Sequence, residues 1–91
     1  MTAGPEALLT PTEADLSALW SSVLGTLVES PAADFFNCGG DSFLATKVIV
    51  TIRKQWRIDV AVDLLLENRT LRELARRIDE FTLSDPVEHS R

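Results

Sequence analysis

Residues 39–56 read GGDSFLATKVIVTIRKQW and predict a loop that turns into a helix. The glycines Gly39 and Gly40 allow a tight turn, and Asp41 is a favoured N-cap residue, so we expect the helix to begin at Ser42. The apolar residues after it follow the spacing of one buried helix face: Ala45, Val48, Ile49, Ile52 and Trp56. This helix must therefore pack on a core that the rest of the chain supplies.

Upstream, residues 10–13 (TPTE) combine a capping box, formed by the first threonine and the glutamate, with a proline suited to a first helical turn. The stripe that follows predicts a helix with one buried face made of Leu16, Leu19, Trp20, Val23, Leu24 and Leu27. From 28 to 41 the periodicity stops. We expect a long loop here, held on the core by Phe35 and Phe36.

Downstream, residues 59–67 (DVAVDLLLE) predict a helix of one or two turns, and residues 70–73 (TLRE) form a second capping box. The helix that begins there has the stripe Leu71, Leu74, Ala75, Ile78 and Phe81. Residues 1–9 and 83–91 are predicted to be flexible tails around a domain of residues 10–82. With no alternating strand pattern, the sequence predicts a small all-α four-helix bundle with three main helices, one short helix and a long first loop.

Composition excludes several classes of function. Ninety-one residues suffice for one domain, and the net charge of −5, with every Lys and Arg at Lys47 or later, argues against nucleic-acid binding. No apolar run is long enough to span a membrane, and the start lacks a signal-peptide pattern. The one cysteine, Cys38, cannot form an internal disulfide. We expect a monomeric cytoplasmic protein that binds neither nucleic acid nor membrane. Tail-like composition at both ends favours a free-standing chain.

The junction at Gly39, Gly40, Asp41 and Ser42 is the candidate functional site. A serine at the start of a helix points outward beside unsatisfied N–H groups, where the helix dipole favours a phosphate ester. The alternative is that Asp41 and Ser42 only cap the helix. Ser42 is a poor catalytic nucleophile, because the one histidine, His89, lies near the end of the chain and no other base is evident. Metal ligands are equally scarce.

Residues 35–46 (FFNCGGDSFLAT) resemble the signature of peptidyl carrier proteins, also called thiolation domains, which have the acyl-carrier fold. The TPTE opening and residues 65–71 (LLENRTL) fall in the family's order, and the resemblance runs from about residue 10 to 81. It implies that Ser42 receives 4'-phosphopantetheine from coenzyme A through a Mg-dependent phosphopantetheinyl transferase, with Asp41, Gly40 and Gly39 forming the attachment site.

The resemblance also implies the partners. The thiol of the arm would hold an aminoacyl or peptidyl group as a thioester. An adenylation enzyme would load it, and condensation, tailoring or thioesterase enzymes would act on it in nonribosomal peptide synthesis, the route to many antibiotics and other secondary metabolites. The domain itself would catalyse nothing. Its contact surface is predicted at Phe43, Thr46 and Val50, which lie off the buried stripe on one shared face, and the family implies that Leu66 extends it. The alternative is that Phe43 folds back onto the first loop and that Val50 is an isolated apolar residue on the surface.

Two alternatives stay open. Fatty-acid and polyketide acyl carriers share the fold, but residues 43–57 contain four basic residues and no acid, whereas fatty-acid carriers typically have an acidic second helix. The sequence therefore favours the peptidyl type. An unmodified helical interaction module would account for the helices but would leave the Gly-Gly-Asp-Ser junction unused.

Several residues depart from the family pattern. Cys38 stands where leucine is usual, and we expect it to pack as a small hydrophobe. Trp56 and Arg57 replace a smaller aromatic residue and a glycine, which puts a sharp end of the second helix in doubt. Leu66 stands where phenylalanine is common, and Arg69 stands where a proline often precedes the last helix.

Overall fold

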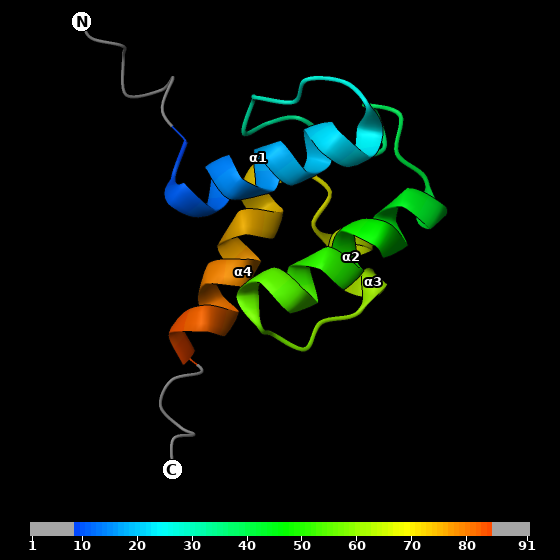
Figure 1. Cartoon of the computed structure of the whole chain (residues 1–91). Helices are drawn as coiled ribbons and strands as arrows, with labels where there is room; N and C mark the ends of the chain where they lie inside the picture. The colour runs from blue at the N-terminus through cyan, green and yellow to red at the C-terminus, as the bar shows by residue number, and fades with distance from the viewer. Residues whose placement is uncertain (1–8, 85–91) are drawn as a thin grey trace, which may run out of the picture.

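The computed structural model describes residues 9–84, which fold into four helices. They are α1 (Pro11–Leu24), α2 (Ser42–Trp56), α3 (Val62–Glu67) and α4 (Leu71–Ser84) (Figure 1). Helix α1 packs against α4 and α2, and α3 packs against α2. Within residues 9–84 there is no strand, only an isolated β-bridge between Asp34 and Thr70. The predicted all-α bundle with three main helices, one short helix and a long first loop is confirmed.

The predicted tails lie mostly outside the described residues. Of residues 1–9, only Leu9 is described, and its side chain packs against the core. Helix α4 extends to Ser84, two residues beyond the predicted domain boundary at 82. None of the helices within the described part of the chain is long and apolar enough to cross a membrane.

Helix α1 begins as predicted but ends earlier. Thr10 and Glu13 form a capping box, and Gly25 ends the helix in the left-handed region at φ 73°. The prediction that Leu27 lies on the buried face is wrong, because Leu27 follows this stop and its side chain is 73% exposed. Val28 is buried instead, and its N–H donates to Ser21 Oγ at 2.9 Å.

Helix α2 begins where the sequence predicts. The Asp41 carboxylate accepts a hydrogen bond from the Leu44 N–H at 2.9 Å, and the helix begins at Ser42. At the other end Arg57 adopts the left-handed conformation with φ 58° and ψ 45°, so the helix stops sharply although no glycine is present. A left-handed conformation strains a residue that has a Cβ, and Arg57 bears that cost.

The last two helices are joined by a short connection. Helix α3 occupies only the second part of the predicted 59–67 stretch. At the start of α4 the predicted capping box is present: Thr70 Oγ1 accepts from the Glu73 N–H at 3.2 Å, and Glu73 Oε1 accepts from the Thr70 N–H at 3.3 Å.

One core holds the helices together. Phe35 is fully buried and makes edge-on contact with Trp20, the ring centroids lying 5.0 Å apart, so the first loop is pinned on the core as predicted. Phe36 is half-buried and packs edge-on against Phe35. Cys38 is half-buried against the core, in line with its expected packing role. The largest fully buried side chains are Trp20, Phe35, Leu16, Ile52, Leu65, Leu71, Leu74, Ile78 and Val48.

Candidate functional site

Ser42 is the first residue of α2, and it is exposed. The local hydrogen bonds around it do not use its hydroxyl. Asp41 caps the helix through its carboxylate, and Thr46 Oγ1 donates to the main-chain oxygen of Ser42 at 2.9 Å. The first N–H groups of a helix lack partners within the helix and carry its positive dipole end. Ser42 therefore presents a free hydroxyl at a position that favours a phosphate group.

The two glycines before Ser42 serve different needs. Gly39 has φ 104°, a conformation that favours glycine, and a Cβ there would meet nothing within 4 Å. Gly40 needs space instead, because a Cβ would lie 2.3 Å from Phe35 Cε2 and 2.4 Å from Phe35 Cδ2. Its N–H donates to the Phe35 carbonyl oxygen at 3.0 Å. The buried Phe35 thus holds the turn that leads directly into Asp41 and Ser42.

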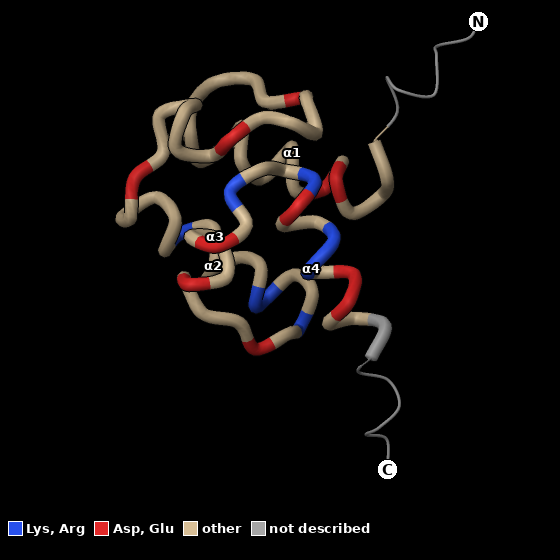
Figure 2. Tube along the Cα trace, turned by 180° about the vertical axis from the view of Figure 1, so that it is seen from behind, with Lys and Arg blue, Asp and Glu red and all other residues tan. Residues whose placement is uncertain are grey.

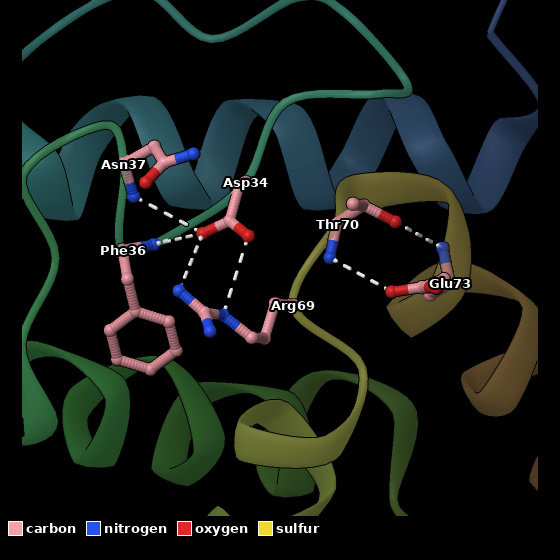
Figure 3. A network of polar contacts seen from close by, with 6 residues as sticks. All are labelled: Asp34, Phe36, Asn37, Arg69, Thr70 and Glu73. Carbon is pink, nitrogen blue, oxygen red and sulfur yellow. Dashed lines mark hydrogen bonds and ion pairs between the residues drawn. The ribbon is translucent and has the colours of Figure 1, made fainter.

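The polar part of the loop is held by a second group of contacts (Figure 3). Asp34 Oδ1 accepts hydrogen bonds from the N–H groups of Phe36 at 2.9 Å and Asn37 at 3.1 Å. The carboxylate also pairs with Arg69, whose Nε lies 3.3 Å from Asp34 Oδ2. Sequence reasoning did not single out Asp34, and it noted Arg69 only as a departure from the family's proline. An Asp followed by a turn is a local signal for the Asp34 bonds, whereas the pair with Arg69 joins residues 35 positions apart.

The predicted contact residues lie on the surface. Phe43 is 68% exposed, Val50 43% and Leu66 44%, and Thr46 is exposed as well. Phe43 does not fold back onto the loop; the Lys47 ammonium lies 5.2 Å from the centroid of its ring. By their spacing, Phe43, Thr46 and Val50 share a face of α2. Leu66 lies on α3 and, with Phe36 and Arg69, lines a shallow pocket of about 320 Å³.

Charge divides the molecule unevenly (Figure 2). The loop between α1 and α2 carries acidic residues and no Lys or Arg. At the far end of α2 from Ser42, a groove of about 540 Å³ is lined by Val50, Arg53, Lys54, Arg57, Ile58 and Asp59. Helix α2 therefore offers an apolar residue beside its exposed serine and cations at its other end.

Comparison with known proteins places this geometry in a family. Residues 14–78 match the family described as the phosphopantetheine attachment site. The chain is 39% identical over 88 residues to a hybrid PKS-NRPS synthetase of Neonectria sp., covering 90% of this chain and 2% of that protein. It is 41% identical over 71 residues to the chondramide synthase of Chondromyces crocatus, covering 78% of this chain and again 2% of the relative.

Solved structures of carrier domains have the same fold as this chain. A thiolation-reductase di-domain from an archaeal non-ribosomal peptide synthetase superposes with a TM-score of 0.74 at 30% identity, covering 90% of this chain and 17% of that one. A structure described as a non-ribosomal PCP domain gives a TM-score of 0.66 at 29% identity, covering 76% and 88%. The chain belongs to the phosphopantetheine attachment site family, as a carrier domain similar to the thiolation domains of nonribosomal peptide synthetases.

Proposed function

We propose that the chain is a peptidyl carrier whose 4'-phosphopantetheine arm is attached to Ser42. The observation that carries this proposal is the exposed hydroxyl of Ser42 at the first position of α2, directly after the Gly39-Gly40 turn and inside the matched residues 14–78. The family implies the cofactor, and this geometry supports Ser42 as its site.

The residues at the junction fit the group. Asp41 is occupied as the N-cap of α2, so the first turn is preformed when a transferase approaches. Ser42 would hold the group as a phosphate ester: its oxygen bonds to the pantetheine-side phosphorus, the pyrophosphate bond of coenzyme A breaks and releases adenosine 3',5'-bisphosphate, and the hydroxyl proton passes to a base of the transferase or to solvent. The N–H groups of the first turn that have no partner within the helix would then be available to hydrogen-bond the phosphate. When attached, the arm supplies a thiol that carries acyl groups as thioesters.

The chain's own part is to present the acyl group, and carrier domains in general are non-catalytic. A serine acts as a catalytic nucleophile only with a base in hydrogen-bond reach. The one histidine of the chain, His89, lies outside the described residues; beside Ser42, Asp41 caps α2 and the Thr46 hydroxyl donates to the Ser42 main-chain oxygen. Tethering raises the effective concentration of the acyl group at each partner enzyme.

The peptidyl subtype is supported by the surface of α2. The helix has no acidic residue, and its last turn is basic, so it does not offer the acidic surface typical of fatty-acid carriers. We propose that Phe43, Thr46, Val50 and Leu66 contact the phosphopantetheinyl transferase and then adenylation, condensation, tailoring or thioesterase enzymes. Aromatic residues, Phe included, are enriched in the cores of protein interfaces, so Phe43 is the anchor of this surface and the smaller side chains surround it.

Intact-mass measurement tests the attachment. The protein is incubated with coenzyme A, Mg²⁺ and a promiscuous phosphopantetheinyl transferase, together with Ser42→Ala and the control Ser22→Ala, which alters another serine, in α1. We expect one phosphopantetheine on the wild type and on the control, and none on Ser42→Ala. A folded wild type that gains no mass would contradict the carrier function, and a modified Ser42→Ala variant would place the arm elsewhere.

A further inference from the structure

Arg69, in the connection between α3 and α4, holds the loop that leads to Ser42. The Arg69 carbonyl oxygen accepts from the Phe35 N–H at 2.8 Å. Its guanidinium meets both carboxylate oxygens of Asp34, with Nε 3.3 Å from Oδ2 and an Nη 3.5 Å from Oδ1. The same guanidinium lies over the Phe36 ring, 5.0 Å from the centroid. Figure 3 shows Arg69 lying between the Asp34 carboxylate and the Phe36 ring. Three consecutive loop residues are therefore held by a single side chain and its carbonyl.

Asp34 links Arg69 to the turn that follows it. Besides Arg69, its Oδ1 accepts from Phe36 and Asn37, and its main-chain oxygen accepts from the Cys38 N–H at 3.0 Å. A carboxylate that accepts several N–H bonds and a planar guanidinium at once has little freedom to rotate. Arg69 thus restricts the turn formed by residues 34–38, immediately before Gly39.

The turn is connected to the attachment site. Phe35 accepts the hydrogen bond from the Gly40 N–H, and its ring packs where a Gly40 Cβ would be. A shift of Asp34 and Phe36 would therefore move Phe35 and Gly40 and, through Asp41, the first turn of α2. The buried Phe35 ring anchors the loop from the inside, and Arg69 anchors it from the exposed side.

We propose that Arg69 is a positioning residue for the modification of Ser42, acting through Asp34 and Phe36. This inference rests on the proposed carrier function. The contacts of Arg69 with Asp34, Phe35 and Phe36, called the clamp below, keep the loop in the conformation that a transferase recognises. Losing the clamp lowers the fraction of molecules that can be modified. Apparent affinity falls in proportion to that fraction, which raises KM for the carrier and leaves kcat largely unchanged. A partly exposed ion pair and a cation–π contact together predict a rise in KM of about three- to tenfold.

The variants separate the clamp from general stability. Arg69→Gln removes the ion pair and the cation–π contact. Asp34→Asn keeps an oxygen that can accept from Phe36 and Asn37 but removes the charge that pairs with Arg69. The control is Arg77→Gln, which makes the same change at an exposed arginine of α4 paired with Glu80 at 3.4 Å. Steady-state transfer from coenzyme A is measured with the carrier as the varied substrate, after thermal unfolding has shown each variant folded.

We expect Arg69→Gln and Asp34→Asn each to raise KM, and the double variant to be no worse than the poorer single one, because both remove the same pair. Arg69→Lys should restore only part of the loss, since lysine cannot bind a carboxylate through two N–H groups. Amide NMR signals of Asn37, Gly40 and Ser42 should shift in the apo form of Arg69→Gln, which reports the loop without any transfer reaction. Arg77→Gln should match the wild type in every respect.

The experiment distinguishes a failure of the carrier function from a failure of the positioning role of Arg69. A folded wild type that is never modified contradicts the carrier function itself. If the wild type is modified and Arg69→Gln has the same KM, or if the two single effects add in the double variant, the positioning role is overturned and the carrier function stands. Should Arg69→Gln not fold, Asp34→Asn and Arg69→Lys decide the matter by the same criteria.

Discussion

Replacing Gly40 by alanine should destabilise the domain through a single buried ring. The added Cβ would lie 2.3 and 2.4 Å from two carbons of Phe35 and 2.8 Å from its carbonyl oxygen. The ring cannot easily withdraw, because it is fully buried between Trp20 and Phe36 with centroid distances of 5.0 and 5.3 Å. The carbonyl oxygen cannot withdraw either without lengthening the hydrogen bond from the Gly40 N–H.

The cost follows from these contacts. Forcing an extra methyl group into a packed core costs roughly 1–3 kcal/mol, and the combination of ring and carbonyl contacts predicts a loss of about 2–3 kcal/mol here. For a domain of this size the melting temperature should fall by roughly 10–20 °C. Urea unfolding followed by circular dichroism measures the free energy directly, and an unchanged m value would show that only stability has changed.

A second substitution tests the cause. In a Phe35→Leu background the clash is relieved, so Gly40→Ala should cost at least about 1 kcal/mol less than in the wild type. Gly39→Ala is the matched control: its strain comes from φ and not from Phe35, so its cost should be the same in both backgrounds. If Gly40→Ala costs less than about 0.5 kcal/mol, or costs as much in the Phe35→Leu background as in the wild type, the steric argument is refuted.

Three further perturbations have predictable outcomes. Arg57→Gly should raise the free energy of unfolding by about 0.5–1 kcal/mol in a urea titration, because glycine adopts the left-handed conformation without strain; an unchanged or lower value would contradict this. Thr10→Ala should lower it by about 1 kcal/mol by breaking the capping box with Glu13, and a change near zero would show that the box contributes nothing. Phe43→Ala should change stability by less than about 0.5 kcal/mol yet slow aminoacyl loading by an adenylation enzyme about fivefold or more; normal loading would remove Phe43 from the contact surface.

The sequence predicts what is decided locally. Both capping boxes and the start of α2 at Ser42 involve residues at most a few turns apart, and all are present in the structure. The predicted stripes of α2 and α4 are buried except at their last members, Trp56 and Phe81, which are half-buried against the core. Periodicity alone misplaced Leu27, because Gly25 stops α1 in the left-handed region before the stripe is complete. Here the conformational preference of one residue outweighs a favourable apolar spacing.

Long-range contacts could not be predicted in the same way. Nothing local marks Arg69 as the partner of Asp34, since the pair depends on how the α3–α4 connection passes the first loop. The requirement for Gly40 is equally hidden, because it comes from the position of the Phe35 ring and not from φ. At Arg57 the family's glycine is absent, yet the helix stops sharply with Arg57 itself in the left-handed conformation, between the half-buried Trp56 and the buried Ile58.

The division of roles at the junction supports the functional interpretation of Ser42. Gly39 is required by its φ, Gly40 by the Phe35 ring, and Asp41 by the Leu44 N–H that it caps. Each therefore has a structural reason that would hold if the chain carried no group at all. The hydroxyl of Ser42 has no such reason: the fold uses only its main chain, and the side chain is exposed. A side chain without a structural role, held in place by neighbours that all have one, is what a carrier needs, because the arm must leave the surface at a fixed point while the chemistry takes place on its partners.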